Sequence, residues 1–510
     1  MFLDLKVGAL AEPISGRRWA EADVVQEVAR RTARFQCQGL AAGDRVFLLF
    51  GNRLEFFAEL LAIWRLGACA VPVDARLTAF EVSTLIAAAS PRLAVVDEAT
   101  DAAVIAVLSA AGVAAVDTRE TGSQEATVGL SRLDDDALIL FTSGSTGAPK
   151  GVIHTHRSLR ARWLSLRDHL GVAAFARSLC LLPTHFGHGL ICNSLFPWLA
   201  GQDLYITPPF RADILMRLGA LVDEHGITFM SSVPSLWRLA LKMSRPPQGR
   251  TLQRIHCGSA PLSAAVWEDI RAWTGTRQVC NAYGITETGS WVAGLSNADT
   301  PAEDGLIGGG WGAVIRILST SDTSVPLDGS LECAVGDAGF VWLNTPALMK
   351  GYFQRDDLTR QAVVDGWFLT GDIGFLDDRG RLVLRGRERD EINRGGMKIY
   401  PGDVDAVVER FPGVTDVCTF ALDDEMYGQA VGIAVVLNAR DDATIRALYR
   451  WMTEHLAAHK MPGRWWLVDE IPRTSRDKIN RDQVKAACVN EPGLELIRIL
   501  GASGNTAGNP

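Results

Sequence analysis

The stretch Phe141–Gly151 (FTSGSTGAPKG) contains the residue types that bind phosphate. Between Thr142 and Gly151 it places four hydroxyl side chains, three glycines and one lysine, directly after the apolar run ALIL. Glycines let backbone N–H groups converge on an anion, hydroxyls add donors, and a lysine supplies compact positive charge. Pro149 stands where the common phosphate-loop formula has a glycine before its lysine. The sequence therefore predicts a phosphate loop of another kind, formed by Thr142, Ser143, Gly144, Ser145, Thr146, Gly147 and Lys150.

Buried strands are expected to position this loop. From Arg45 to about Tyr283, continuous apolar runs such as VFLLF, CAVPV, LILFTS and ITFMSSV alternate with longer helical patterns. Such runs are typical of strands covered on both faces, as in a parallel sheet with crossover helices. Between about Gly305 and Asn344, the runs VIRIL, GSLECAV and GFVWLN predict a smaller β subdomain. The expected fold class is α/β.

A second, smaller domain is expected after the charged stretch RERDEINRGG. The strand-like VTDVCTFALDD and GQAVGIAVVLN and the helix-like TIRALYRWMTEHLAAH predict a compact α+β unit. We expect a large N-terminal domain of parallel sheets over residues 1–388 and a small mobile C-terminal domain over 389–500. The segment 501–510 (GASGNTAGNP) has almost nothing to bury and is expected to be a disordered tail.

The composition argues against several classes of function. Lys and Arg number 51 against 59 Asp and Glu, a formal charge of -8, whereas a general nucleic-acid binder needs clustered basic charge. The nine cysteines form no C-x-x-C pair, so we expect buried free thiols in a reducing compartment. The N-terminus lacks the order of a signal peptide, and Glu59 and Arg65 interrupt the longest apolar region. These features predict a cytoplasmic protein that binds neither nucleic acid nor membrane.

Five motifs, in order along the chain, resemble the signature motifs of the adenylate-forming superfamily, which includes acyl-CoA synthetases, adenylation domains of peptide synthetases and luciferases. TSGSTGAPKG resembles its phosphate loop, NAYGITETG its Y-G-x-T-E motif and WFLTGD its T-G-D motif. RGRERDEINRGGMKIYP resembles its hinge region, and PRTSRDKINR its C-terminal lysine motif. The five span about Thr142 to Arg481. The resemblance implies that the protein uses ATP to convert a carboxylic acid to an acyl-adenylate, releasing pyrophosphate.

Adenylation brings two anions together, so its site needs positive charge and a metal ion where negative charge accumulates. Glu287 is expected to hold Mg²⁺ against phosphate oxygens, and Thr286 beside it to bond the α-phosphate. Asp372 can accept hydrogen bonds from both ribose hydroxyls, and Arg387 can assist at the ribose or the phosphates.

The resemblance implies that the small domain acts twice. Lys478 matches the lysine that reaches across the domain gap to the carboxylate and the α-phosphate, although Asp477 stands before it where the family has glycine. Arg389 matches the hinge about which the domain rotates between adenylation and acyl transfer. Gly395 and Gly396 resemble the glycine pair that lies along the pantetheine tunnel of CoA ligases.

The resemblance also implies residues that contact the acid and the adenine. PTHFGHGL matches the segment of the gate aromatic, which falls on Phe186, with His188 lining the acyl pocket. A metal site at the H-x-x-H pair of His185 and His188 has no third ligand nearby. HCGSAPLS matches the stretch that packs against adenine. The nucleotide-contacting residues expected from these motifs are Gly258, Ser259, Ala260, Pro261, Asn281, Tyr283 and Gly284, and those expected at the acid are Phe186, His188, Trp237 and Gly284.

The predicted function is an ATP-dependent carboxylate ligase that forms an acyl-adenylate and passes the acyl group to CoA. The alternatives are an amide ligase, which passes the same adenylate to an amine or amino acid, and a catalytically silent nucleotide-binding scaffold. No carrier segment with a D-S-L type serine follows the small domain, which disfavours a peptide-synthetase module. Bulky rings in the pocket motifs favour a compact, ring-containing or short-to-medium acid over a long fatty chain. The expected cofactors are ATP and Mg²⁺, with CoA as co-substrate.

Overall fold

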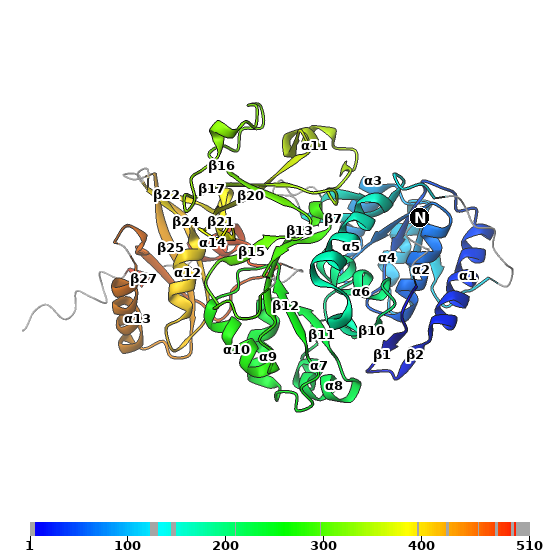
Figure 1. Ribbon diagram of the computed structural model, residues 1–510, viewed down its shortest axis with the longest axis horizontal. Helices are drawn as coiled ribbons and strands as arrows, with labels where there is room; N and C mark the ends of the chain where they lie inside the picture. Colours follow the sequence, from blue (N-terminus) through cyan, green and yellow to red (C-terminus); the bar gives the residue numbers. More distant parts are fainter. Residues whose placement is uncertain are drawn as a thin grey trace, which may run out of the picture.

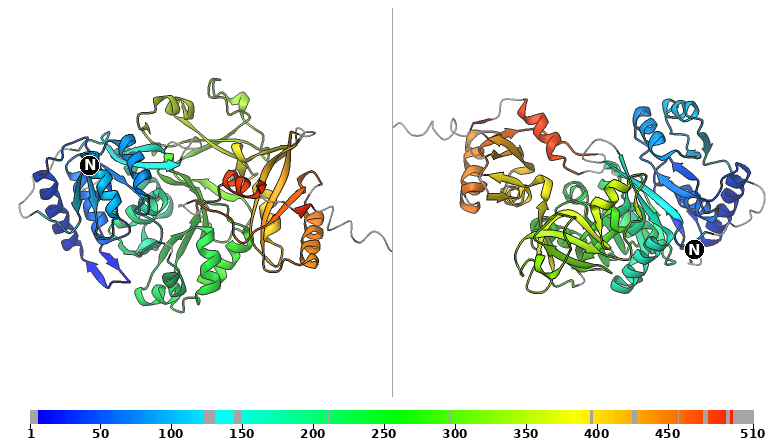
Figure 2. Two further views of the ribbon diagram at one scale, coloured as in Figure 1. Left: turned by 180° about the vertical axis from the view of Figure 1, so that it is seen from behind. Right: turned by 90° about the horizontal axis from the view of Figure 1, so that it is seen from above.

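Three β-sheets organise the described part of the chain (Figure 1). The computed structural model describes residues 6–122, 131–143, 149–209, 211–295, 297–394, 397–424, 428–456, 458–474, 478–490 and 494–495. Two large sheets and their helices form the main body, and the third sheet lies at the end of the molecule opposite helices α1 (Glu21–Cys37) and α2 (Leu54–Arg65) (Figures 1 and 2).

The first sheet holds the phosphate-loop segment at one side. Its strand order is β18-β8-β7-β4-β3-β5-β6, with β3, β4, β5 and β6 parallel and β7 paired antiparallel to β8. Its strands are β3 (Arg45–Leu48), β4 (Cys69–Pro72), β5 (Leu93–Val96), β6 (Ala114–Asp117), β7 (Asp136–Ser143), β8 (Pro149–Thr155) and β18 (Gly351–Tyr352). The helices near it include α3 (Ala79–Ala89), α4 (Ala102–Ala110) and α5 (His156–Leu170). The hairpin β7–β8 brings Thr142 opposite Lys150.

The second sheet runs through the centre of the main body. Its path is β16-β17-β20-β21-β15-β14-β13-β12-β11-β9-β10-β1-β2, parallel from β13 to β1 and antiparallel on the other side. The strands of the first half of this path, with β19 attached to β20, are β16 (Val314–Leu318), β17 (Gly339–Asn344), β20 (Trp367–Leu376), β21 (Leu382–Arg387), β15 (Leu306–Gly310), β14 (Ser290–Gly294) and β19 (Val363–Val364). Those of the second half are β13 (Val279–Ile285), β12 (Arg254–Gly258), β11 (Phe229–Ser232), β9 (Arg177–Cys180), β10 (Asp203–Ile206), β1 (Leu10–Glu12) and β2 (Arg17–Trp19).

Short helices cover the second sheet and connect its strands. They are α6 (Phe196–Trp198), α7 (Ala212–Met216), α8 (Leu218–His225), α9 (Pro234–Met243), α10 (Ala264–Thr274), α11 (Asp356–Ala362) and the π-helix η3 (His188–Leu195). The β region expected after Gly305 is present, and β14 joins it to the parallel strands within one sheet. GSLECAV was expected to be a strand, and this was wrong. It contains a 3₁₀ turn, η5 (Gly329–Leu331), and meets β16 through the isolated bridge Leu318–Glu332 and the ion pair of Arg316 with Glu332.

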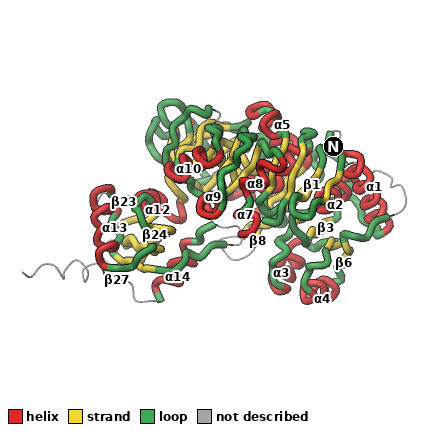
Figure 3. The backbone as a smooth tube through the Cα atoms, turned by 90° about the horizontal axis from the view of Figure 1, so that it is seen from below, coloured by secondary structure: helices red, strands yellow, loops and turns green. Residues whose placement is uncertain are grey.

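The third sheet belongs to the small C-terminal unit, which stands off the main body (Figure 3). Its strands are β22 (Ile392–Arg394), β23 (Met397–Ile399), β24 (Val414–Asp424), β25 (Gly428–Leu437), β26 (Arg464–Leu467) and β27 (Leu494–Glu495). Its helices are α12 (Pro401–Glu409), α13 (Asp442–His455) and α14 (Arg481–Val489). Along the chain, β21 is the last strand of the second sheet and β22 is the first strand of the third. The chain therefore passes from one sheet to the other close to Arg389. The domain limits at 388 and 389 remain predictions, and residues 501–510 lie outside the described part.

The apolar region that contains Glu59 forms a core helix followed by a buried strand, α2 and β4, as the sequence predicts. Within the described residues, no helix is both long enough and apolar enough to cross a membrane. The expectation that every cysteine is buried was wrong, because Cys37 is exposed and Cys333 is partly exposed.

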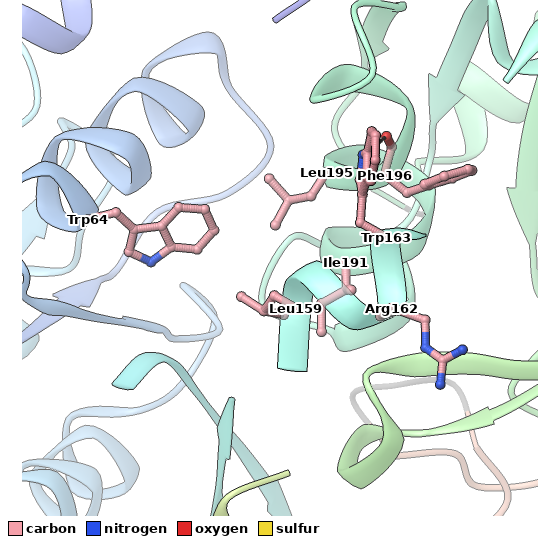
Figure 4. Close-up of a pocket in the computed structure, with 7 residues that line it drawn as sticks. All are labelled: Trp64, Leu159, Arg162, Trp163, Ile191, Leu195 and Phe196. Carbon is pink, nitrogen blue, oxygen red and sulfur yellow. Dashed lines mark hydrogen bonds between the residues drawn. The ribbon is translucent and has the colours of Figure 1, made fainter. Parts of the chain in front are cut away.

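The two large sheets are packed closely where α2 meets α5. Figure 4 shows a cavity at this contact, which has a volume of about 10 Å³. Such a volume accommodates about one water molecule, so this cavity is too small for a substrate. Its lining residues are Trp64, Leu159, Arg162, Trp163, Ile191, Leu195 and Phe196.

A buried ionic cluster fixes α1 against α2. Glu59, which has no exposed surface, accepts from Arg31 Nε at 3.1 Å, from Thr118 Oγ1 at 3.0 Å and from the guanidinium of Arg34. We expect Glu59→Gln to lower the unfolding free energy by about 3–5 kcal/mol, because it leaves the buried guanidinium of Arg34 without its carboxylate and leaves Arg31 with Glu27 alone. The control Glu98→Gln removes a half-exposed partner of Arg53 and should cost less than about 1 kcal/mol.

Guanidinium chloride unfolding, followed by circular dichroism, measures this difference. Because a chain with more than one domain need not unfold in one step, the transition midpoints of the two variants should be compared with that of the wild type. Equal midpoints for both variants would contradict a stabilising role for the Glu59 cluster.

Candidate active site

A buried carboxylate, Asp372, joins three strands of the central sheet. It is 4% exposed, accepts a hydrogen bond from the Tyr283 hydroxyl through Oδ2, and lies 2.8 Å from Arg387 Nε through Oδ1. Nearby Asp372 raises the pKa of Arg387 above its usual value. Burial raises the pKa of Tyr283 well above its usual value, and Asp372 raises it further, so Tyr283 stays a donor. A carboxylate has about four lone-pair sites, so Asp372 keeps capacity to accept from the hydroxyls of a ligand.

A cavity of about 260 Å³ opens beside this cluster. Three of the predicted site residues, Lys150, Glu287 and Arg387, meet in its wall, although they come from β8, the 3₁₀ turn η4 (Thr286–Thr288) and β21. Two cations and one carboxylate therefore face one space. The other lining residues are Ile285, Tyr352, Leu358, Gln361, Ala362, Phe368, Leu369, Thr370 and Gly371.

Tyr352 contacts both Glu287 and Lys150 in the wall of this cavity. Its hydroxyl donates to Glu287 Oε1 at 2.8 Å, and the ammonium of Lys150 lies 5.6 Å from the centroid of its ring. Burial raises the pKa of Tyr352, and the charge of Glu287 raises it further. The sequence analysis missed Tyr352, because the segment KGYFQ (350–354) around it contains no local signal for a contact with Glu287.

The turn that contains Thr286 and Glu287 is held by its backbone. His154 Nε2 lies 2.7 Å from the carbonyl oxygen of Thr286, and the N–H of Met349 donates to the carbonyl of Glu287 at 2.7 Å. Burial lowers the pKa of His154 to about 4, so the imidazole is neutral and can donate from Nε2 to this carbonyl. Both contacts come from segments far from the turn in sequence, and they orient its two side chains.

Arg162 anchors the end of the same turn from inside the core. This residue has no exposed surface and donates to the carbonyl of Thr288 at 3.0 Å, to the carbonyl of Trp311 at 2.8 Å and to Thr345 Oγ1 at 3.3 Å. Burial lowers the pKa of Arg162 to about 10, so the guanidinium remains charged at neutral pH. Sequence analysis missed this residue, because an arginine in a helical pattern is more often solvated.

The acyl side predicted from the sequence is centred on His188, the first residue of η3. His188 is 3% exposed, with Nδ1 lying 2.9 Å from Ser259 Oγ and Nε2 lying 2.5 Å from Ser231 Oγ. Burial lowers the pKa of His188 to about 3, and the positive charge of Lys478 lowers it further. The imidazole is therefore neutral, and the predicted lysine of the small domain acts electrostatically on this part of the main body.

Aromatic rings close the space around His188. Phe186 lies 5.9 Å away and Trp291 lies edge-on at 5.5 Å, measured between ring centroids. Behind Trp291, His256 follows at 4.3 Å and stacks on Trp311 at 5.5 Å. The last three rings are at most 1% exposed, so they leave little room for a long chain beyond His188.

His185 lies elsewhere, 3.5 Å from Asp74, so the H-x-x-H pair has two separate sets of partners.

Two predicted site residues have structural partners in the core. Trp237 has no exposed surface, donates from Nε1 to Ser232 Oγ at 2.6 Å and packs edge-on against Trp273. Asn281 is 4% exposed and donates to the carbonyl of Leu306. Their contacts with substrate therefore remain predictions.

The predicted close approach of backbone at Gly258 and Gly284 has a visible cause. A Cβ at Gly258 would lie 2.2 Å from the carbonyl oxygen of Ala282, and one at Gly284 would lie 2.1 Å from that of Ser290. Neighbouring strands thus require both glycines.

Ser259, the partner of His188, has a φ of 66°, a left-handed conformation that is uncommon outside glycine and is often found at functional sites. Ala260 and Pro261 follow it, and Pro261 is exposed.

Several predictions fall outside the described residues. The affected residues are Gly144, Ser145, Thr146, Gly147, Gly395, Gly396 and Asp477, together with the side chains of Ser143 and Arg389. Of the phosphate-loop residues that are described, Thr142 donates through Oγ1 to the carbonyl of Lys150 at 3.4 Å.

The fold and this site define an α/β enzyme whose charged cavity lies in the main body, with a small α+β unit after it. Residues 9–353 match the family model described as AMP-binding enzyme, and residues 403–478 match the AMP-binding enzyme C-terminal domain. The chain belongs to the AMP-binding enzyme family. It is an adenylate-forming acid ligase, which confirms the reaction class and the α/β fold class predicted from its motifs.

Relatives of known function resemble the chain along nearly its whole length. The 2-succinylbenzoate–CoA ligase of Geobacillus kaustophilus is 30% identical over 480 residues, covering 92% of this chain and 93% of the relative. The long-chain-fatty-acid–CoA ligase FadD13 of Mycobacterium tuberculosis is 29% identical over 493 residues, covering 93% and 94%. ATP-bound MatB from Rhodopseudomonas palustris has a TM-score of 0.84 at 26% identity, covering 95% and 96%.

We expect Asp372→Asn to raise the KM for ATP about tenfold to a hundredfold. The variant loses charge-assisted hydrogen bonds, worth about 1.5–3 kcal/mol each, to Arg387 and to any ligand hydroxyl. Asp378→Asn, an exposed position in the turn after the same strand, is the matched control. Initial rates at varied ATP, with calorimetric ATP titration, provide the measurement. Unchanged ATP affinity in a folded Asp372→Asn protein would rule out this role.

Proposed function

We propose that the protein is an acyl-CoA synthetase that uses MgATP to activate a compact carboxylic acid and then passes the acyl group to the thiol of CoA. The observation that supports this most directly is geometric: Lys150, Glu287 and Arg387, three residues expected at the nucleotide, line one cavity of about 260 Å³. Relatives that match nearly the whole chain are named as CoA ligases, which favours CoA over an amine. ATP and CoA, the two co-substrates proposed here, are both compatible with the predicted cytoplasmic location.

The cavity wall supplies groups suited to a nucleotide. Lys150 and Arg387 place positive charge where phosphates would lie, and Asp372 can accept from ribose hydroxyls. Mg²⁺ is usually bound by one or two carboxylates together with substrate phosphates, so Glu287 in the same wall fits this ion. When bound, the ion would neutralise charge on the phosphate oxygens. Thr286, next to Glu287, is proposed to bond the α-phosphate.

In the first half-reaction, a carboxylate oxygen attacks the α-phosphorus and pyrophosphate leaves. Negative charge builds up on the α-phosphate oxygens in the transition state, and the ammonium of Lys478 is proposed to stabilise it there. Because His188 is neutral, it does not compete with Lys478 for the negative charge on the α-phosphate. Its two serine contacts hold the ring in place.

In the second half-reaction, the CoA sulfur attacks the acyl carbon, the thiol proton is lost and AMP leaves. Rotation about Arg389 is proposed to withdraw Lys478 and to bring Gly395 and Gly396 along the pantetheine arm. An amide ligase would need a pocket for the amine and a base for its proton, and we assign no residue to that role.

The acid is proposed to be compact. The rings of Phe186, His188 and Trp291 lie within 6 Å of their neighbours, and the buried rings behind Trp291 fill the space into which a long chain would extend. A short-to-medium or ring-containing acid fits this environment, in contrast to the substrate named for FadD13.

We expect Lys478→Ala to lower adenylate formation about a hundredfold and to leave thioester formation from supplied acyl-adenylate nearly intact. Loss of one charged contact that acts only in the first transition state costs about 3 kcal/mol. Pyrophosphate release and the CoA-dependent consumption of synthetic acyl-adenylate measure the two steps separately. Equal losses in both steps would be incompatible with the proposed role of Lys478.

A pyrophosphate-release screen of carboxylic acids, run with and without CoA, tests the proposed function as a whole. We expect the fastest substrate to be a short or ring-containing acid, and CoA to accelerate turnover with formation of a thioester. Palmitate as the best substrate would contradict the proposed acid class. Amide formation with amino acids, without any effect of CoA, would identify the acceptor as an amine while leaving adenylation in place.

A further inference from the structure

One arginine of the main body binds two carboxylates of the small domain. Arg238, on α9, donates from Nη2 to Glu409 Oε1 and from Nη1 to Asp416 Oδ1, the latter at 3.2 Å. These three side chains are 23%, 21% and 19% exposed. Partly buried ion pairs are screened less by salt than exposed ones, so this contact is stronger than an ordinary surface pair.

Asp416 extends the contact toward Lys478. Its other oxygen, Oδ2, lies 2.7 Å from Arg473 Nη2, so one carboxylate joins a guanidinium from each domain. Arg473 forms a β-bridge with Ile479, the residue after Lys478. The N–H of Thr474 donates to the carbonyl of Lys478 at 2.8 Å, and the N–H of Lys478 donates to Thr474 Oγ1 at 3.2 Å. The backbone of Lys478 is thus fixed relative to Arg473.

A second anchor holds the other side of the lysine segment within the small domain. Arg481 lies 2.7 Å from Asp405 Oδ2 and donates to the carbonyl of Thr419. Burial raises the pKa of Asp405, and the charge of Arg481 opposes this rise. The Arg481 anchor fixes the segment to α12 and β24, whereas the Asp416 anchor also connects it with α9 of the main body.

The charges in this cluster depend on one another. Burial raises the pKa of Glu409, and the charge of Arg238 opposes this rise. Burial alone would lower the pKa of Arg238, but Glu409 and Asp416 raise it above its usual value. Removal of one member of such a group leaves a partly buried charge without its partner.

We propose that Arg238, Asp416 and Arg473 form an ion-pair bridge that positions Lys478 for the adenylation half-reaction. This inference rests on the role of Lys478 in the proposed function. The three are positioning residues, because they act through the lysine segment. Arg410 and Asp304 form another pair across the same domain boundary. Asp304 also accepts a hydrogen bond from the N–H of Ala264 in the main body, so this second pair is not part of the bridge through Arg473.

Half-reaction kinetics of the full-length variants Arg238→Ala and Asp416→Asn test the bridge, with the fastest acid of the screen as substrate. We expect adenylation to fall about tenfold, which corresponds to about 1.4 kcal/mol, and thioester formation from synthetic acyl-adenylate to stay within about twofold of wild type. Arg238→Lys should recover part of the loss, because a lysine keeps the charge but not the two-carboxylate geometry. The control Arg440→Ala removes an exposed pair with Asp469 inside the small domain and should change neither step.

The double variant Arg238→Ala/Asp416→Asn should lose no more adenylation than either single variant, because each change breaks the same bridge. Equal losses in both half-reactions would show a general structural role and overturn the inference. If Lys478→Ala loses adenylation while the bridge variants keep it within about twofold, the bridge alone is wrong. If Lys478→Ala keeps full adenylation, the proposed role of Lys478 fails, and the inference fails with it.

Discussion

The geometry of the nucleotide site depends on one cation buried in the main body. Arg162 has no exposed surface, and its guanidinium holds Thr288, Trp311 and Thr345, which lie on three separate segments. A buried polar group left without its partner costs about 1–3 kcal/mol, and more when it is charged. Each of these segments is therefore held to the others through one side chain. The turn with Glu287 ends at Thr288, so the position of that carboxylate in the cavity follows from a contact made inside the core.

The charges of the site are separated along its length. Lys150 and Arg387 line the cavity where phosphates are proposed to bind, while the buried imidazole of His188 is neutral because burial lowers its pKa to about 3. Charge interactions in a water-poor site are much stronger than in bulk water. A cationic histidine at the acyl side would therefore attract the phosphates toward the wrong end. With a neutral imidazole there, Lys478 is the cation that movement of the small domain is proposed to add or withdraw.

Sequence reasoning predicted the α/β fold class and the reaction class because both leave local signals: continuous apolar strands and motifs of fixed spacing. The structure brings Lys150, Glu287 and Arg387, which the motifs assigned to the nucleotide, to one cavity, and their roles there stay predictions. Contacts between distant segments leave no such signal, and for this reason Tyr352 and Arg162 were missed. GSLECAV has the composition of a strand, but it forms a 3₁₀ turn at η5. Trp237 was predicted beside the acid from its position near a motif. Its ring packs against Trp273, and its contact with the acid stays a prediction.

The kind of contact between the domains matters for an enzyme whose small domain is proposed to move between two steps. Contacts across the boundary include ion pairs of Arg238 and Arg410, whose side chains are 23% and 45% exposed. The more exposed Arg410 pair contributes about 1 kcal/mol or less. The less exposed Arg238 pairs contribute more, and water can replace the partners of both arginines when they separate. A large apolar interface would stabilise one orientation by several kilocalories per mole and would slow its release. Ion pairs thus allow an orientation that is specific, because the charges must align, and yet close enough in free energy to others for the domain to leave it after each adenylation.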